Sequence, residues 1–135
     1  MAYNLTTRQS GEVTVIQLSG CFDLGPDSTV LHDMLHDVEA GGAKKILLNL
    51  REVSFIDSAG LGELTSGHVR ARHDGISLKL TCPSRRVEEL FQMTGLSKVL
   101  DIYDDESDAL GSWTQSGQNV DKILALDETA ESRPA

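Results

Sequence analysis

The amino-acid sequence predicts an α/β fold: a single mixed, mostly parallel sheet of about five strands, with an N-terminal antiparallel hairpin and about four helices. Two strand-like segments follow one another directly at the N-terminus, which is typical of a hairpin. Strand-like and helical segments then alternate, as expected for parallel strands joined by crossover helices. At 135 residues, of which 39% are hydrophobic, the chain can form one domain with a substantial core.

The hairpin is predicted from residues 3–8 and 13–19, with turn chemistry at Ser10-Gly11 between them. A helix is expected to open at Gly25-Pro26-Asp27, because proline is tolerated where the first helical N–H has no partner. Gly41-Gly42 ends this helix. Its apolar residues recur at helical spacing, and they are Val30, Leu31, Met34, Leu35 and Val38.

Residues 46–50 form a nearly continuous apolar run, which predicts a strand covered on both faces. We expect a loop at residues 51–54, followed by the strand-like pair Phe55-Ile56. The next helix is predicted over residues 58–73 and is ended by Asp74-Gly75. The inward positions of this helix are expected to be Leu61, Leu64, Val69 and Ala71.

The remainder of the domain continues the alternation. Residues 76–81 alternate as a strand, and Pro83-Ser84 starts a helix that Gly95 ends. Residues 99–103 then form a short strand, and residues 106–113 form a final helix. The inward side chains of the helix after Pro83-Ser84 are expected to be Val87, Leu90, Phe91 and Met93.

The net charge of −9 is concentrated at the C-terminal end. Residues 1–100 hold 12 acidic and 10 basic side chains, whereas residues 101–135 hold 9 and 2. We therefore expect one domain over residues 1–112 and an acidic C-terminal extension over residues 113–135. Within the extension, residues 114–119 are predicted to be a polar linker, residues 120–126 a short amphipathic helix and residues 127–135 disordered.

Composition also argues against several classes of function. An acidic chain repels phosphate backbones and anionic membrane surfaces, so direct binding of nucleic acid or membrane is not expected. No apolar run approaches the roughly 20 residues of a spanning helix, and no signal peptide opens the sequence. The two cysteines, Cys21 and Cys82, are expected to be free thiols in a reducing cytoplasm.

The segment Phe-Ile-Asp-Ser-Ala-Gly-Leu-Gly, residues 55–62, lies between a predicted strand and a predicted helix. A helix N-terminus has unsatisfied N–H groups and a partial positive charge, and Asp57 adds a negative charge there. Gly60 and Gly62 carry no side chain, so another surface could approach the backbone closely. One interpretation of Ser58 is a helix N-cap, worth about 1 kcal/mol. A capping serine can also be phosphorylated, so the two interpretations are compatible.

Three short elements occur in an order and spacing that resemble the STAS domain, in particular the bacterial anti-anti-sigma factors. They are Gly-Cys-Phe-Asp at residues 20–23, the segment at residues 55–62 and Thr-Gly-Leu at residues 94–96. The resemblance covers residues 3–111. In such proteins the motif serine, here Ser58, is phosphorylated by an anti-sigma factor that is itself a serine kinase, and a phosphatase resets the switch. The unphosphorylated form binds the anti-sigma factor and so releases a sigma factor.

The resemblance also implies a set of partner-binding residues around this serine. The chain departs from the family pattern at Asn49, where an aspartate is common, and at Arg51, where a small polar residue is common. The acidic tail lies outside the resemblance, and a homodimer is possible. The residues implied to contact the partner are Asp23, Asp57, Ser58, Ala59, Gly60, Leu61 and Gly62.

Other functions have less support from the same residues. A hydrolase nucleophile at Ser58 would need glycine at the position of Ile56. His32 and His36 have a spacing that can bind metal, but no further ligands are evident, so neither a metal nor a cofactor is expected. The STAS resemblance therefore predicts a binding protein and not an enzyme. A cytoplasmic subunit of a transport complex and a subunit of a stress-sensing assembly are the alternatives.

Overall fold

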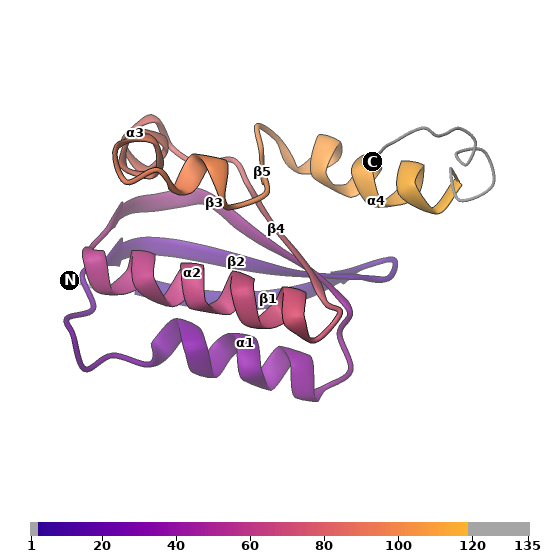
Figure 1. Cartoon of the computed structure of the whole chain (residues 1–135), viewed down its shortest axis with the longest axis horizontal. Coiled ribbons are helices and arrows are strands. Elements are labelled where there is room, and N and C mark those ends of the chain that lie inside the picture. The colour runs from indigo at the N-terminus through magenta and orange to yellow at the C-terminus, as the bar shows by residue number, and fades with distance from the viewer. Residues whose placement is uncertain (1–2, 119–135) are drawn as a thin grey trace.

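The structure, a computed structural model, describes residues 3–118 of the chain. One sheet has helices packed on both of its faces (Figure 1). The elements in chain order are β1 (Tyr3–Ser10), β2 (Val13–Phe22), α1 (Val30–Ala40), β3 (Lys45–Ile56), α2 (Ser58–His73), β4 (Ser77–Thr81), α3 (Arg85–Met93), the 3-10 helix η1 (Leu96–Lys98), β5 (Ile102–Tyr103) and α4 (Glu106–Gln118). This order confirms the predicted fold class.

The five strands form one mixed sheet in the order β1-β2-β3-β4-β5. The hairpin strands β1 and β2 pair antiparallel, and their turn contains Gly11 with a φ of 61°. The other neighbouring strands pair parallel. The carboxyl ends of β2, β3 and β4 therefore lie at one edge of the sheet, which is where open α/β sheets commonly carry their binding sites.

The central strand β3 is buried on both faces. Ile46, Leu48 and Leu50 belong to the main core, which also contains side chains of α1, α2 and α3. Leu47 faces the other way and packs in a smaller core with Ala109 of α4. This two-sided burial explains why residues 46–50 are apolar at nearly every position. Figure 1 shows α1 and α2 side by side on one face of the sheet.

The first helix begins later than its sequence predicts. We expected it to open at Gly25-Pro26-Asp27, but α1 starts at Val30. Gly25 has a φ of 80°, and the Ser28 N–H donates to the Gly25 carbonyl at 3.3 Å. The Gly-Pro segment therefore forms a turn before the helix, which is the other common use of these residues.

The prediction of a loop at residues 51–54 is wrong, because β3 runs unbroken through them. The strand continues to pair with β2 there, and Gly20 lies opposite Val53. Val53 is buried, whereas its polar neighbours Glu52 and Ser54 are exposed. A half-buried strand accepts this alternation, so the polar residues do not end it.

Two side chains predicted to face inward are exposed instead. Val69 of α2 is 58% exposed and Met93 at the end of α3 is 81% exposed. On α2 the inward stripe includes Gly67, where an added Cβ would lie 2.5 Å from Leu35 Cδ1. A glycine at that position allows α1 and α2 to approach closely.

The last helix, α4, is fixed to the face opposite α1 and α2. Trp113 is buried and donates from Nε1 to Ser77 Oγ at 2.8 Å. Lys79 of β4 is also buried, and its Nζ lies 4.5 Å from the centre of the Trp113 ring and 5.1 Å from that of Tyr103. Its ammonium group also donates to the Ser112 hydroxyl. These cation–π contacts and the hydrogen bond stabilise a buried cation.

The C-terminal boundary of α4 also differs from the prediction. The helix extends to Gln118, so residues 114–118 are helical and are not the expected polar linker. The helix expected at residues 120–126 and the disordered end lie outside the described residues. The division between residues 112 and 113 stays a prediction.

A polar cluster joins β1, β3 and the start of α4. Glu106 accepts two hydrogen bonds from Arg8, at 2.7 and 2.8 Å, and one from Asn49 Nδ2 at 2.8 Å. The Arg8 guanidinium, aided by Asn49 and opposed by partial burial, holds the pKa of Glu106 below its usual range. The Asn49 Oδ1 accepts from the Arg51 N–H at 2.9 Å. Both departures from the family pattern therefore take part in one cluster that holds α4.

Candidate functional site

Two aspartates follow neighbouring strands at the carboxyl edge of the sheet. The parallel strands β2 and β3 end opposite one another, with Phe22 paired to Ile56. Asp23 and Asp57 come directly after them. The Asp57 N–H donates to the Phe22 carbonyl at 3.0 Å, which fixes the start of α2 to the end of β2. Strand order thus brings Asp23 beside the motif residues from which it is distant in sequence.

The N-cap of α2 is Asp57. Its Oδ1 accepts from the Gly60 N–H at 2.8 Å, and its Oδ2 accepts from the Gly25 N–H at 2.9 Å. The interpretation of Ser58 as the cap is therefore wrong, and Ser58 is the first helical residue. The Asp57 carboxylate thus satisfies an N–H of the first helical turn that has no partner within the helix. It also holds residues 23–29, the β2–α1 loop, through the bond to Gly25.

The pKa of Asp57 lies below its ordinary value. Partial burial acts to raise it, but the backbone N–H groups of Gly25, Gly60 and Leu24 stabilise the charged form and outweigh burial. A depressed folded-state pKa means that the carboxylate stabilises the fold above its unfolded pKa. That stability is lost as the pH falls through the folded pKa.

Asp57→Ala is therefore expected to lower the free energy of unfolding by about 1–2 kcal/mol at pH 7, because a cap and a loop contact are lost. The difference from the parent chain should shrink as the pH falls from about 4, the ordinary carboxyl range, toward the lowered folded-state pKa of Asp57. Urea unfolding followed by circular dichroism at several pH values measures it. Asp27→Ala, which removes an exposed carboxylate of the same loop, is the matched control and should change stability little. A pH-independent difference at Asp57 would contradict the capping role.

The predicted docking residues divide into a surface set and a buried set. Gly60 and Leu61 are buried, so they can support the surface but offer little of it to a partner. Ser58 is exposed, and within residues 3–118 no hydrogen bond engages its hydroxyl. The residues that reach the surface, fully or in part, are Asp23, Asp57, Ser58, Ala59 and Gly62.

The two motif glycines have different roles. A Cβ added to Gly60 would lie 2.7 Å from Ile56 Cγ2 and 3.4 Å from Asp57 Oδ1. A Cβ added to Gly62 would meet nothing within 4 Å. Gly60 therefore allows the helix to pack on β3, and only Gly62 leaves open backbone at the surface.

Gly60→Ala is expected to lower the free energy of unfolding by about 1–3 kcal/mol, because the new methyl group overpacks against Ile56. Gly62→Ala, two residues away on the same helix, is expected to raise it by up to about 1 kcal/mol, because alanine favours helix. Chemical unfolding of both variants measures the contrast. Equal effects would contradict the assigned packing role of Gly60.

Glu63 is a site residue that the sequence analysis missed. Its Oε1 accepts from the N–H groups of Leu31 and His32, at 2.9 and 3.0 Å, so a side chain of α2 caps the N-terminus of α1. Thr29, the N-cap residue that precedes α1, makes no side-chain cap hydrogen bond of its own. The contact spans about thirty positions of sequence, and no local pattern signals it.

A groove of about 770 Å³ lies between the β2–α1 loop and the first turns of α2. Ser58 lines it together with Glu63 and His32. The complete lining consists of Gly25, Pro26, Ser28, Thr29, His32, Asp57, Ser58, Ala59, Gly62, Glu63 and Ser66. Small and hydroxyl-bearing side chains predominate around the serine.

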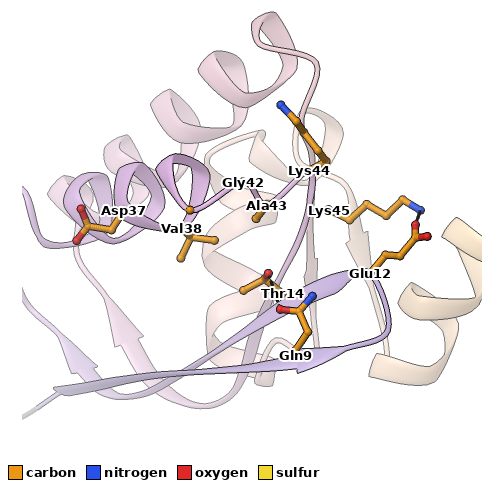
Figure 2. Close-up of a pocket in the computed structure, with 10 residues that line it drawn as sticks. Gln9, Glu12, Thr14, Asp37, Val38, Gly42, Ala43, Lys44 and Lys45 are labelled. Carbon is orange, nitrogen blue, oxygen red and sulfur yellow. Dashed lines mark hydrogen bonds and ion pairs between the residues drawn. The ribbon is translucent and has the colours of Figure 1, made fainter.

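A second hollow lies at the opposite edge of the sheet, between the hairpin and the end of α1 (Figure 2). Lys45 Nζ is paired with Glu12 Oε1 at 2.9 Å, and Thr14 donates to Gln9 at 3.1 Å. These four polar side chains therefore satisfy one another in pairs across the hairpin and β3. Among residues 3–118, no three His, Cys, Asp or Glu side chains gather as a metal site needs, and no helix could cross a membrane.

The sequence and the fold are similar to those of known proteins. The family model described as STAS domain matches residues 4–109. The chain is 31% identical to an anti-sigma-B factor antagonist of Bacillus subtilis, over 76% of this chain and 92% of that protein. It is 30% identical to an anti-sigma F factor antagonist of Paenibacillus polymyxa, over 73% and 84%. The solved structure of the anti-sigma factor antagonist SpoIIAA in its unphosphorylated form superposes with a TM-score of 0.62 at 25% identity, covering 94% of this chain and all of that one.

Proposed function

The chain belongs to the STAS domain family, and from this premise we propose that it is an anti-anti-sigma factor switched by phosphorylation of Ser58. Its unphosphorylated form binds an anti-sigma factor and so releases a sigma factor. The anti-sigma factor is itself a serine kinase that modifies Ser58 and thereby ends the complex, and a phosphatase restores binding. The two relatives named as anti-sigma factor antagonists support this proposal.

The exposed Ser58 hydroxyl is the observation that carries the proposal. A kinase can modify only a hydroxyl that reaches its active site. Because Asp57 supplies the helix cap, the Ser58 hydroxyl is not needed to hold α2 together. A phosphate can therefore be added and removed at this position while the fold is retained.

The proposed docking surface surrounds this hydroxyl. Gly62 offers open backbone on the same helix, and Asp23 adds an exposed carboxylate from the end of β2. Ala59 is half-buried, and Gly60 and Leu61, which follow it in α2, are buried. Helix start, loop and strand end are fixed to one another by Asp57, so a partner meets a preorganised surface.

Phosphate mapping tests the proposal. The chain is incubated with ATP and candidate serine kinases, and mass spectrometry locates the modification. Phosphate is expected on Ser58 and should be absent from Ser58→Ala. Ser66→Ala is the matched control, since Ser66 is also exposed on α2 and lines the same groove. Its removal should leave the modification in place.

Two outcomes of this mapping would contradict the proposal. Phosphate on another residue in the presence of an anti-sigma factor kinase would move the switch away from Ser58. An unmodified chain that instead copurifies with a transporter ATPase would favour a subunit of a transport complex.

A further inference from the structure

The groove beside Ser58 has an uneven charge. Its lining contains two carboxylates, Asp57 and Glu63, and among the described lining residues only His32 can carry a positive charge. Asp27 precedes His32 in the β2–α1 loop, and Asp33 and Asp37 follow His32 on α1. A phosphate on Ser58 would therefore enter a surrounding that is mostly acidic.

Backbone N–H groups at a helix N-terminus are the usual partners of a phosphate. Here several of them are already engaged. The Gly60 N–H of α2 is taken by Asp57, and the N–H groups of Leu31 and His32 of α1 are taken by Glu63. The groove thus sits between two helix starts whose donors are partly satisfied by carboxylates of the protein itself.

Side chains that line the groove can add to the backbone donors that are not engaged in this way. The Thr29 hydroxyl donates to Asp33 at 2.9 Å, so its proton is in use. The His32 side chain is exposed in the groove, and its ring stacks on that of His36 with centroids 6.4 Å apart. An imidazole can donate a hydrogen bond and can also carry a charge close to neutral pH.

We infer that a phosphate on Ser58 lies in the groove between the β2–α1 loop and α2, and that His32 is the side chain that pairs with it. This inference rests on the proposed function for its biological meaning. It adds a positioning residue for the phosphorylated state, supplied by α1 and absent from the motif at residues 55–62. The titratable groups that neighbour His32 are Asp33, His36 and Asp37 along α1, Asp27 in the β2–α1 loop, and Asp57 and Glu63 in the groove lining.

The test places phosphoserine at position 58 of the full chain through a reassigned amber codon, so that no kinase is needed. Phosphorus NMR then follows the second ionisation of the phosphate from about pH 5 to pH 8. In His32→Asn this ionisation is expected to occur at a pH higher by about half a unit than in the unsubstituted chain, because a nearby imidazolium favours the dianion. The shift should shrink at high salt, as for any exposed pair.

The matched control is His36→Asn, which removes an exposed imidazole one helical turn away and outside the groove lining. It should leave the phosphate ionisation close to that of the unsubstituted chain. Nitrogen NMR gives a reciprocal reading, since the phosphate should raise the pH at which His32 titrates and leave His36 nearly unchanged.

Identical phosphate titrations in the unsubstituted chain, His32→Asn and His36→Asn would overturn the inference. So would equal shifts in the two histidine variants. Because phosphoserine is installed directly, this result is separate from the mapping experiment. If the kinase does not modify Ser58, the proposed function is contradicted, but the pairing measured by NMR stands. If the phosphate titration is unaffected by His32→Asn, the pairing is contradicted, but the proposed function stands.

Discussion

Ser58→Glu is expected to weaken binding of the anti-sigma factor at least about 100-fold, whereas Ser58→Ala should bind within about threefold of the parent chain. A complex that covers this corner must bury the new charge without a partner, which costs several kcal/mol, and each 1.4 kcal/mol is tenfold in affinity. A phosphate, with about −1.5 to −2 charges, should weaken binding further. Isothermal titration calorimetry at one ionic strength measures all three forms.

A charge control separates this local effect from a general one. Ser66→Glu adds the same charge two turns further along α2, and its affinity should fall much less. Circular dichroism should show that Ser58→Glu keeps the fold, because the start of a helix tolerates a negative charge. Parent-like affinity for Ser58→Glu would reject the switch.

Asn49→Asp is expected to lower the free energy of unfolding by about 3 kcal/mol at pH 7. Asn49 is 5% exposed, and its Nδ2 donates to Glu106 at 2.8 Å. An aspartate there would place two carboxylates within hydrogen-bond distance and raise the pKa of the pair. The loss should therefore be full above the usual carboxyl pKa and should diminish in acid, where one proton can be shared. Urea unfolding at pH 7 and at about pH 4 measures the difference.

Two further variants identify the cause. Asn49→Leu removes the hydrogen bond without adding a charge, so it should cost less than Asn49→Asp. The double variant Asn49→Asp with Glu106→Gln reverses donor and acceptor and should recover much of the lost stability. If the double variant is no more stable than Asn49→Asp alone, like-charge repulsion at Glu106 is not the reason for the loss.

The elements that the sequence predicted well are those with regular burial and clear ends. α2 was predicted over residues 58–73 and has these bounds, because Asp57-Ser58 and Asp74-Gly75 mark both of its termini. The central strand was recognised at residues 46–50 and at Phe55-Ile56, but the residues between them were predicted to be a loop. Its continuation depends on pairing with β2, and a partner strand is not visible in the local sequence.

The prediction of inward positions was wrong on α2, where a glycine faces the core. Val69 was predicted to be buried because its apolarity fits a helical stripe, yet Gly67 faces α1. Hydrophobic periodicity cannot report a contact that has no side chain. Likewise, Ser58 and Asp57 are both residue types that suit an N-cap. Asp57 occupies the N-cap position because its carboxylate also accepts a hydrogen bond from the Gly25 N–H, a contact that the local sequence does not show.

The candidate site was predicted in outline through Ser58, Asp57 and Asp23. Its groove was not, because it depends on contacts between residues distant in sequence. Glu63 reaches across to the start of α1, and His32 enters the lining from that helix. As isolated residues, neither carries a signal that separates it from an ordinary solvated side chain.

Trp113 is the only tryptophan of the chain, and it lies buried on α4 with the Lys79 ammonium group 4.5 Å from its ring centre. Indole emission responds to water and to nearby charge, so the protein contains its own fluorescent reporter. Figure 1 places α4 away from the N-terminal end of α2, where Ser58 lies. Emission should therefore report detachment of α4 or loss of the fold while remaining nearly silent to events at Ser58. Unfolding can then be followed in an unlabelled sample with little interference from modification or binding at Ser58.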